Sequence, residues 1–350
     1  MILLILKQHE VPYNLLSTIA ILLRLPESHS KFQNCKQEVA NYYSGYKGEL
    51  ALDYYLTFVD QLSVHILHDV RLPFINSHYQ IDTLILTPNF IVNIEVKNLT
   101  GFIRFNHEMG RMYQYIGQKE RSYQDPLLQA NSQAHQLKAF LYNEGLSHIP
   151  IESLIIFVNQ KASLSEERDK RIIYGFQLKQ RFDEFSKKYQ NSSLLKINSL
   201  TQKLIQQNQP LQINMLKHLG IREDELIYGV ICPHCLHIPM LRVYGRWICQ
   251  SCLNTFRAEA HVRSFYEYAL IISNIINNKN ARKLLNVDSI HVIQKLLKKA
   301  GFTPRGETSN RTYLIDVNLQ NKAQYLLNYY LKMSKQNRFG EKRVFFSETN

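Results

Sequence analysis

Residues 91–101 read IVNIEVKNLTG, an apolar run that is interrupted by one carboxylate and one ammonium group. Its β-branched residues and the polar residues that follow predict a β-strand. Because side chains alternate between the two faces of a strand, Glu95 and Lys97 share one face. Exposed Glu–Lys pairs are common, so this pair alone is better explained by an ordinary surface salt bridge.

A second strand-like run, HYQIDTLILT at residues 78–87, lies just before the first, across a turn at Pro88-Asn89. Gln80 and Asp82 share one face of this strand. If the two runs pair across the turn, Asp82 lies close to Glu95. The sequence therefore predicts two carboxylates that converge at a sheet edge, with a lysine beside them.

This grouping has a clear chemical use. Hard divalent ions such as Mg²⁺ or Mn²⁺ prefer oxygen ligands, which Asp82, Glu95 and the backbone carbonyl of Val96 would supply. A metal held there polarises a phosphate and lowers the pKa of a bound water. Lys97 would orient that water or stabilise the developing negative charge.

The surrounding pattern predicts an α/β domain with a mixed central sheet. Helical apolar spacing follows Ser44-Gly45, and strand-like runs then continue to a tyrosine-rich meander at residues 101–117. A helix follows, which Asp125 caps and Pro126 begins. The near-continuous apolar run IESLIIFVN, residues 151–159, is typical of a buried strand.

Four segments together resemble a known family. GYKGELALDYYL, QIDTLIL, IVNIEVKNLTG and DPLLQ occur in this order and at compatible spacing. They resemble the nuclease-related domain (NERD) family of the PD-(D/E)xK nuclease-like superfamily over residues 45–160. The resemblance implies a restriction-endonuclease-like core and a metal-dependent phosphodiesterase site.

The resemblance also implies roles for individual residues. Asp82 and Glu95 match the metal-binding acids and Lys97 matches the catalytic lysine, while Glu49 at the Gly-Glu position would add a metal or water contact. The catalytic set is completed by Gln80 and Gln129. The alternatives are a favourable acid near a helix N-terminus for Glu49, and structural hydrogen bonding for the two glutamines.

A cysteine module follows at residues 226–257. Its two Cys-x-x-Cys pairs are separated by a short hairpin-like segment, a spacing close to that of a zinc ribbon with a closed, structural Zn²⁺ site. Arg242, Arg246 and Trp247 lie between the pairs and would either contact nucleic acid or, for Trp247, cover the small core. The predicted zinc ligands are Cys232, Cys235, Cys249 and Cys252.

The C-terminal part is predicted to be helical and helix-turn-helix-like. KNARKLLNVDSIHVIQKLLKKAGF reads as helix, turn and helix, with the turn at residues 286–289, and GETSNRTYLI would follow as a wing-like hairpin. Lys295, Lys298 and Lys299 make one side basic, which suits DNA binding. Helical pairs of this kind are also common in proteins that bind no nucleic acid.

The predicted domain organisation has five parts. These are an N-terminal helical extension (1–44), the nuclease-like domain (45–160), a helical connector (161–225), the zinc ribbon (226–257) and a C-terminal helical region (258–350). The 350 residues carry 42 Lys and Arg against 29 Asp and Glu, a formal net charge of +13. Such a charge favours polyanionic partners, nucleic acid first.

These features predict a cytoplasmic, Mg²⁺- or Mn²⁺-dependent nuclease with no membrane partner, since no run approaches the ~20 apolar residues that a bilayer span needs. DNA is favoured over RNA as the substrate. The alternatives are a non-catalytic nucleic-acid-binding protein that retains the nuclease-like fold, and a regulatory or scaffold protein without a nucleic-acid partner.

Overall fold

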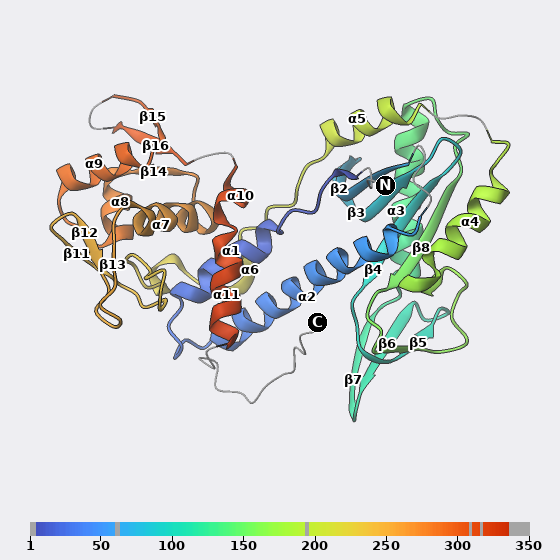
Figure 1. The fold of residues 1–350 in the computed structure, drawn as a ribbon, viewed down its shortest axis with the longest axis horizontal. Helices are drawn as coiled ribbons and strands as arrows, with labels where there is room; N and C mark the ends of the chain where they lie inside the picture. Colours follow the sequence, from blue (N-terminus) through green and yellow to red (C-terminus); the bar gives the residue numbers. More distant parts are fainter. Residues whose placement is uncertain (1–4, 60–63, 193–195, 308–309, 316–317, 336–350) are drawn as a thin grey trace. The chain divides into compact units, whose positions relative to one another are not determined.

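The computed structural model describes residues 5–59, 64–192, 196–307, 310–315 and 318–335 (Figure 1). The chain forms two compact units, and each is built from two stretches of sequence. Met1–His9 and Tyr43–Leu211 make up the first unit, and Glu10–Tyr42 and Gln212–Asn350 make up the second. Helix α2 (Phe32–Leu56) begins in the second unit and ends in the first.

A six-stranded mixed sheet forms the centre of the first unit, in the order β1-β2-β3-β4-β8-β10. Strand β3 is antiparallel to both of its neighbours, β2 and β4. The other pairings are parallel: β1 with β2, β8 with β4, and β10 with β8. The expected mixed sheet is therefore confirmed. The strands are β1 (Ile5–Lys7), β2 (His65–Phe74), β3 (Ser77–Leu86), β4 (Ile91–Lys97), β8 (Ile151–Phe157) and β10 (Ile172–Tyr174).

Helices cover both faces of this sheet. On one face, Leu52 and Leu56 of α2 and Phe182 of α4 (Leu178–Lys188) share a buried cluster with strand residues. On the other face, α3 (Pro126–Asn143) and α5 (Ile197–Gln207) contribute Leu137 and Leu200 to a second cluster. Helix α3 begins as its sequence predicts, because the side chain of Asp125 accepts a hydrogen bond from the Leu127 amide at 2.9 Å.

A four-stranded sheet stands beside the central one, in the order β7-β6-β5-β9. Its first three strands form an antiparallel meander, of which β5 and β6 lie in the tyrosine-rich segment expected to form a hairpin or meander, and β7 follows that segment. Strands β9 and β10 both come after residue 160 and complete the two sheets. The strands are β5 (Gly101–Asn106), β6 (Arg111–Ile116), β7 (Lys119–Gln124) and β9 (Ala162–Leu164).

A buried ion pair lies within the helical part of the second unit. Arg24 and Glu267 have side chains that are 3% and 1% exposed, and the Arg24 Nε donates to a Glu267 carboxylate oxygen at 3.0 Å. The Tyr325 hydroxyl donates to the other oxygen of Glu267 at 3.0 Å. The helices here are α1 (Tyr13–Arg24), α6 (Met215–Leu219), α7 (Ala258–Ile271), α10 (Leu319–Ala323) and α11 (Tyr325–Lys335).

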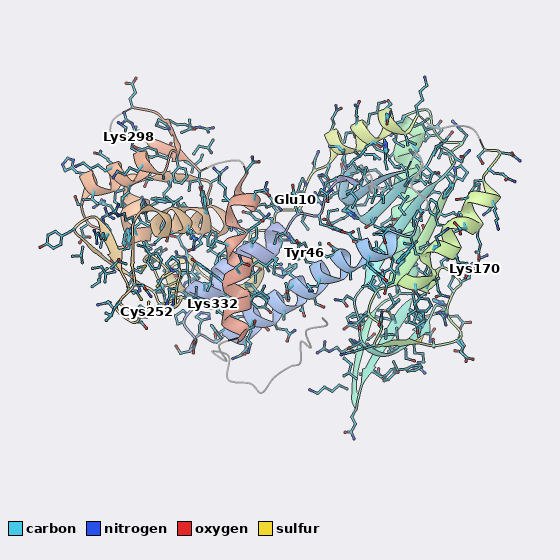
Figure 2. All side chains as sticks on the ribbon, viewed as in Figure 1. Glu10, Tyr46, Lys170, Cys252, Lys298 and Lys332 are labelled. Atoms are coloured by element: carbon cyan, nitrogen blue, oxygen red, sulfur yellow. The ribbon has the colours of Figure 1, made fainter. Side chains whose placement is uncertain are left out.

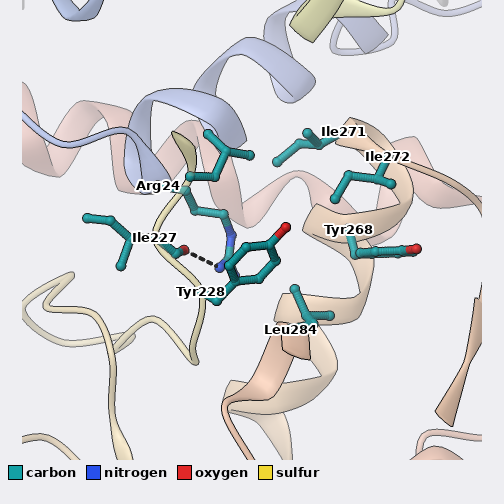
Figure 3. Close-up of a pocket in the computed structure, with 8 residues that line it drawn as sticks. Arg24, Ile227, Tyr228, Tyr268, Ile271, Ile272 and Leu284 are labelled. Atoms are coloured by element: carbon teal, nitrogen blue, oxygen red, sulfur yellow. Dashed lines mark hydrogen bonds between the residues drawn. The ribbon is translucent and has the colours of Figure 1, made fainter. Parts of the chain in front are cut away.

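A small pocket next to Arg24 is a packing gap (Figure 3). The Arg24 guanidinium donates to the carbonyl oxygen of Ile227 at 3.2 Å. The pocket is largely apolar and holds about 10 Å³, space for about one water molecule at most. It is therefore too small for a ligand.

The C-terminal region combines helices with a short sheet. Strand β14 (Ile275–Asn277), helix α8 (Asn278–Leu285), helix α9 (Ile290–Lys299) and strands β15 (Thr303–Arg305) and β16 (Thr312–Leu314) follow α7 in this order. The sheet order is β14-β16-β15, with both pairings antiparallel. This is the strand–helix–turn–helix–hairpin arrangement of a winged helix, and it confirms the expected helix-turn-helix-like region.

The turn between α8 and α9 has the expected chemistry. Asn286 ends α8 in a left-handed conformation, with φ +54°. The Ser289 side chain then caps α9 by accepting from the Val292 amide at 3.3 Å. No helix among the described residues is long and apolar enough to cross a lipid bilayer.

Candidate active site and zinc centre

Asp82 and Glu95 occupy neighbouring positions on adjacent strands. The β3–β4 ladder pairs Thr83 with Ile94, so one further step places Asp82 beside Glu95. The Val96 amide, next to Glu95, donates to an Asp82 carboxylate oxygen at 2.8 Å. The structure thus brings these two acids together, and their catalytic role remains a prediction.

Glu95 is held by three donors, although it is almost fully buried, with a side chain that is only 4% exposed. Lys97 Nζ lies 2.6 Å from one carboxylate oxygen. Gln129 and Gln133 donate to the other oxygen at 2.7 and 2.9 Å. A buried carboxylate requires such partners, because an isolated buried charge is very costly.

The hydrogen bond from Gln133 to Glu95 was not predicted from the sequence. The amide nitrogen of Gln133 also donates to the backbone carbonyl of Gln80 at 2.9 Å, so it links β3 to Glu95. Gln129 and Gln133 are four residues apart on α3 and therefore share a helix face. That spacing is the sequence signal by which Gln133 could have been found.

Gln80 occupies a less central place than expected. Gln80 is exposed, and Gln133 donates its hydrogen bond to the backbone carbonyl of Gln80 rather than to its side chain. The structural interpretation of Gln80 thus accounts for the observed contact. Its direct catalytic role stays a prediction.

Glu49 reaches the site because α2 passes very close to the end of β4. A Cβ atom built on Gly48 would lie 2.5 Å from the Cβ of Asn98, a distance at which something must shift. The glycine before Glu49 is therefore required for close packing. The helix is further tied to this edge by the Asn98 side chain, which donates to the Ser44 carbonyl at 2.8 Å.

Burial and the neighbouring negative charges both disfavour the ionised forms of Asp82 and Glu49 in the absence of a cation. Burial raises the pKa of Asp82 well above its usual range, and the negative charges of Glu95 and Glu49 raise it further. Burial likewise raises the pKa of Glu49, to about 8, with an added contribution from Asp69. A bound divalent cation would relieve this repulsion, so the donor set suits a hard metal ion.

The four predicted zinc ligands converge at one point of the second unit. The sulfur atoms of Cys232, Cys235, Cys249 and Cys252 all lie within 4.8 Å of one another. Cys232 and Cys252 sulfurs are 3.7 Å apart, and those of Cys235 and Cys249 are 3.4 Å apart. Such a four-thiolate cluster fits a structural zinc ion in a closed tetrahedral site.

A small sheet completes the zinc ribbon, with the strands β11 (Leu241–Val243), β12 (Arg246–Ile248) and β13 (Thr255–Phe256). Trp247 on β12 is fully buried, and its indole nitrogen donates to His261 at 3.2 Å. Arg242 lies over the indole ring, with 5.1 Å to its centroid. Trp247 is thus a core residue and is not available to stack on a nucleic-acid base.

The two cysteine pairs form matching turns that place a leucine in the left-handed region. Leu236 has φ +63° and Leu253 has φ +58°, each directly after the second cysteine of its pair. This conformation is unfavourable for a residue that carries a Cβ. Leu236 is 4% exposed and packs in the core, whereas Leu253 is 76% exposed.

We expect Leu253→Gly to stabilise the protein by about 1 kcal/mol, because it removes the Cβ penalty and loses little buried surface. The matched variant Leu236→Gly is expected to destabilise it by about 2 kcal/mol or more, since a buried leucine side chain is lost. Chemical denaturation of the zinc-loaded protein measures both changes. Equal effects of the two substitutions would contradict this explanation.

The comparison with known families agrees with this geometry. Residues 44–158 match the family model described as the nuclease-related domain. The matched stretch of this chain contains Glu49, Asp82, Glu95, Lys97 and Gln129. No curated protein and no solved structure matches the chain. Residues 44–158 of this chain are therefore a nuclease-related domain, carried by a protein that also has a four-cysteine cluster of the zinc-ribbon type.

Proposed function

We propose that this protein is a metal-dependent nuclease that hydrolyses phosphodiester bonds in DNA. The observation that carries the proposal is the buried Glu95 carboxylate, which contacts Lys97 and lies beside Asp82 within a nuclease-related domain. Asp82, Glu95 and the Val96 carbonyl oxygen would hold Mg²⁺ or Mn²⁺. A cation bound there would polarise the scissile phosphate and lower the pKa of a water molecule.

The remaining residues would position the substrate and stabilise charge. The Lys97 ammonium lies 3.4 Å from the amide oxygen of Gln129 as well as 2.6 Å from Glu95, so its position is fixed from two sides. A positioned ammonium stabilises the negative charge that develops on a phosphate oxygen. Gln129 and Gln133 keep Glu95 oriented, and Glu49 would add a further oxygen ligand or hold a water.

An open groove with aromatic walls suits an unstacked base. The groove holds about 370 Å³ and is lined in part by Phe157, which pairs with Lys97 across the β4–β8 ladder. The rings of Tyr174 and Phe176 stack in its wall, with centroids 5.3 Å apart, and Phe176 is 69% exposed. Exposed aromatic rings bind single-stranded nucleic acid by stacking on bases.

The winged-helix arrangement favours double-stranded DNA as the substrate. Helix α9 has the position of a recognition helix in this arrangement. Its exposed polar residues are His291, Gln294, Lys295, Lys298 and Lys299 (Figure 2 labels Lys298), and Ile290 at its start is also exposed. This polar, basic face suits contact with phosphates and base edges in a major groove.

We expect the double substitution Lys295→Ala and Lys298→Ala to make the negative slope of log affinity against log salt less steep by about 2, since each lost phosphate contact removes about 1. Titration of a labelled duplex at several salt concentrations measures this slope. Lys217→Ala, another exposed lysine of the second unit, is the control and should leave it nearly unchanged. An unchanged slope in the double variant would show that α9 does not contact phosphates.

The proposed activity is tested with the purified full chain on linear, circular and single-stranded DNA and on RNA, with Mg²⁺, Mn²⁺ or EDTA. We expect DNA to be cleaved with either metal and left intact with EDTA. Binding of DNA without cleavage under any of these conditions would instead favour the non-catalytic nucleic-acid-binding protein.

A further inference from the structure

Five polar side chains gather in the first unit without having been predicted as a site. His9 follows β1, Glu49 and Asp53 lie one turn apart on α2, and His68 and Asp69 are adjacent on β2. Ligand atoms of His9, Glu49 and Asp69 all lie within 4.8 Å of one another. Those of His9, Asp53 and His68 do so as well.

Two atoms of the first set are buried without a hydrogen-bond partner. They are Nδ1 of His9 and Oε2 of Glu49. The His9 side chain is only 4% exposed, and its Nδ1 lies 3.7 Å from an Asp69 carboxylate oxygen, too far for a hydrogen bond. Buried polar atoms are nearly always paired, so two unpaired atoms in one cluster point to a missing ligand between them.

The surroundings of His9 fix its ring so that Nδ1 faces the acids. Its other nitrogen, Nε2, lies 3.2 Å from an Asp53 carboxylate oxygen. When Nε2 carries the proton, it donates to Asp53, and Nδ1 keeps a free lone pair. A carboxylate that orients the second nitrogen of a histidine is the usual support of a metal-bound imidazole.

The His68 ring holds His9 from one side. The two rings stack with centroids 3.6 Å apart and an angle of 20° between their planes. His68 is in turn fixed by Thr83, whose hydroxyl oxygen lies 2.9 Å from His68 Nδ1. The lone pair of Nδ1 of His9 lies in the plane of its ring, so stacking leaves it free to bind a ligand.

Asp69 adopts a backbone conformation that a strand does not normally contain. Its φ is +52°, in the left-handed region, within β2. The β2–β3 ladder pairs His68 with Thr83 and Val70 with Ile81, but no pair is formed at Asp69. A residue in the left-handed region is uncommon inside a strand, and such positions cluster at functional sites.

We propose that His9, Glu49 and Asp69 form a binding site for a divalent transition-metal ion. One imidazole nitrogen and two carboxylates suit Mn²⁺, Fe²⁺ or Zn²⁺, whereas Mg²⁺ and Ca²⁺ prefer oxygen ligands alone. The site shares Glu49 with the proposed nuclease site, but it does not include Asp82 or Glu95 and does not require that pair to be catalytic. Glu49 lies close enough to both to interact electrostatically with Glu95 and with Asp69.

The competing arrangement has no metal. Burial lowers the pKa of His9, but Asp53 and Asp69 more than offset this, and the net pKa is about 9. In that arrangement His9 is a protonated partner of two carboxylates, and a cation is excluded. The two arrangements differ in whether a metal is bound to nitrogen, which spectroscopy can detect.

The test uses the zinc-loaded full chain titrated with Mn²⁺, a metal that does not compete well for four thiolates. Pulsed electron paramagnetic resonance detects the coupling of Mn²⁺ to a coordinated ¹⁴N nucleus. We expect this coupling in the wild-type protein. We also expect it in Glu95→Gln, in which the proposed nuclease metal site is damaged, so failure of the two proposals can be told apart.

Asp69→Asn is the decisive variant, because Asn keeps the side-chain shape and tolerates the left-handed conformation. Loss of a residue that only hydrogen-bonds a metal ligand already lowers metal affinity about 10–100-fold. Loss of a ligand itself should therefore weaken Mn²⁺ binding at this site at least about 10-fold. His9→Gln should abolish the ¹⁴N coupling, and the exposed control Asp183→Asn should preserve it. The absence of ¹⁴N coupling in the wild type, or unchanged Mn²⁺ affinity in Asp69→Asn, would overturn the proposal.

Discussion

Lys97→Ala is expected to reduce metal-dependent DNA cleavage by about 10²–10³-fold, the usual effect of removing one donor that stabilises transition-state charge. The ammonium lies 2.6 Å from Glu95 and is partly exposed, with a side chain that is 22% accessible. It can therefore contact Glu95 and also reach a substrate bound beside it. Single-turnover cleavage of a labelled duplex at saturating Mn²⁺ measures the change.

Two measurements separate a chemical effect from a structural one. Circular dichroism of Lys97→Ala at the assay temperature should match that of the wild type, although its unfolding temperature should fall, because the buried Glu95 carboxylate loses one of its three donors. Lys187→Ala, an exposed lysine on α4, should cleave at the wild-type rate. Full activity in Lys97→Ala would remove this lysine from the proposed mechanism.

Cys249→Ser is expected to abolish stoichiometric zinc binding and to unfold the zinc ribbon. The Cys249 side chain is fully buried and its sulfur lies 3.4 Å from that of Cys235. Binding of structural zinc contributes about 10–16 kcal/mol in small zinc domains, so loss of one thiolate removes much of the energy that folds the ribbon. Zinc content and thermal unfolding of the purified chain measure the two effects.

Cys35→Ser provides the matched control. Cys35 is also fully buried, but it lies on α2 far along the sequence from the cysteine pairs, and burial raises its pKa to about 12. It should keep a full complement of zinc. Loss of zinc from both variants would mean that the metal content reports general unfolding rather than coordination.

The sequence predicted those features that depend on near neighbours in the chain. The Asp82–Glu95 pairing follows from strand alternation and one short turn, and the zinc ligands follow from two Cys-x-x-Cys spacings. The capped start of α3 and the turn before α9 are likewise encoded within a few residues. Each of these features depends on residues that are close together in the sequence, so it forms whatever the arrangement of the rest of the chain.

Features that depend on distant pairing could be predicted less well. The apolar start of the sequence is compatible with either a strand or a helix, and only pairing with β2, about sixty residues later, makes Ile5–Lys7 a strand of the central sheet. His9 and Asp69 come together only through this pairing, and the left-handed conformation of Asp69 breaks the alternation on which strand predictions rely.

The order in which the two units share the chain has a consequence for dissecting the protein. The backbone passes from the first unit to the second, back to the first and again to the second. A single cut after residue 42 would deprive the first unit of β1 and His9, and would remove α1, with Arg24, from the second. Neither half of a simple truncation is thus a complete folding unit, and a fragment that contains only residues 44–158 would lack one of the three ligands proposed for the transition metal.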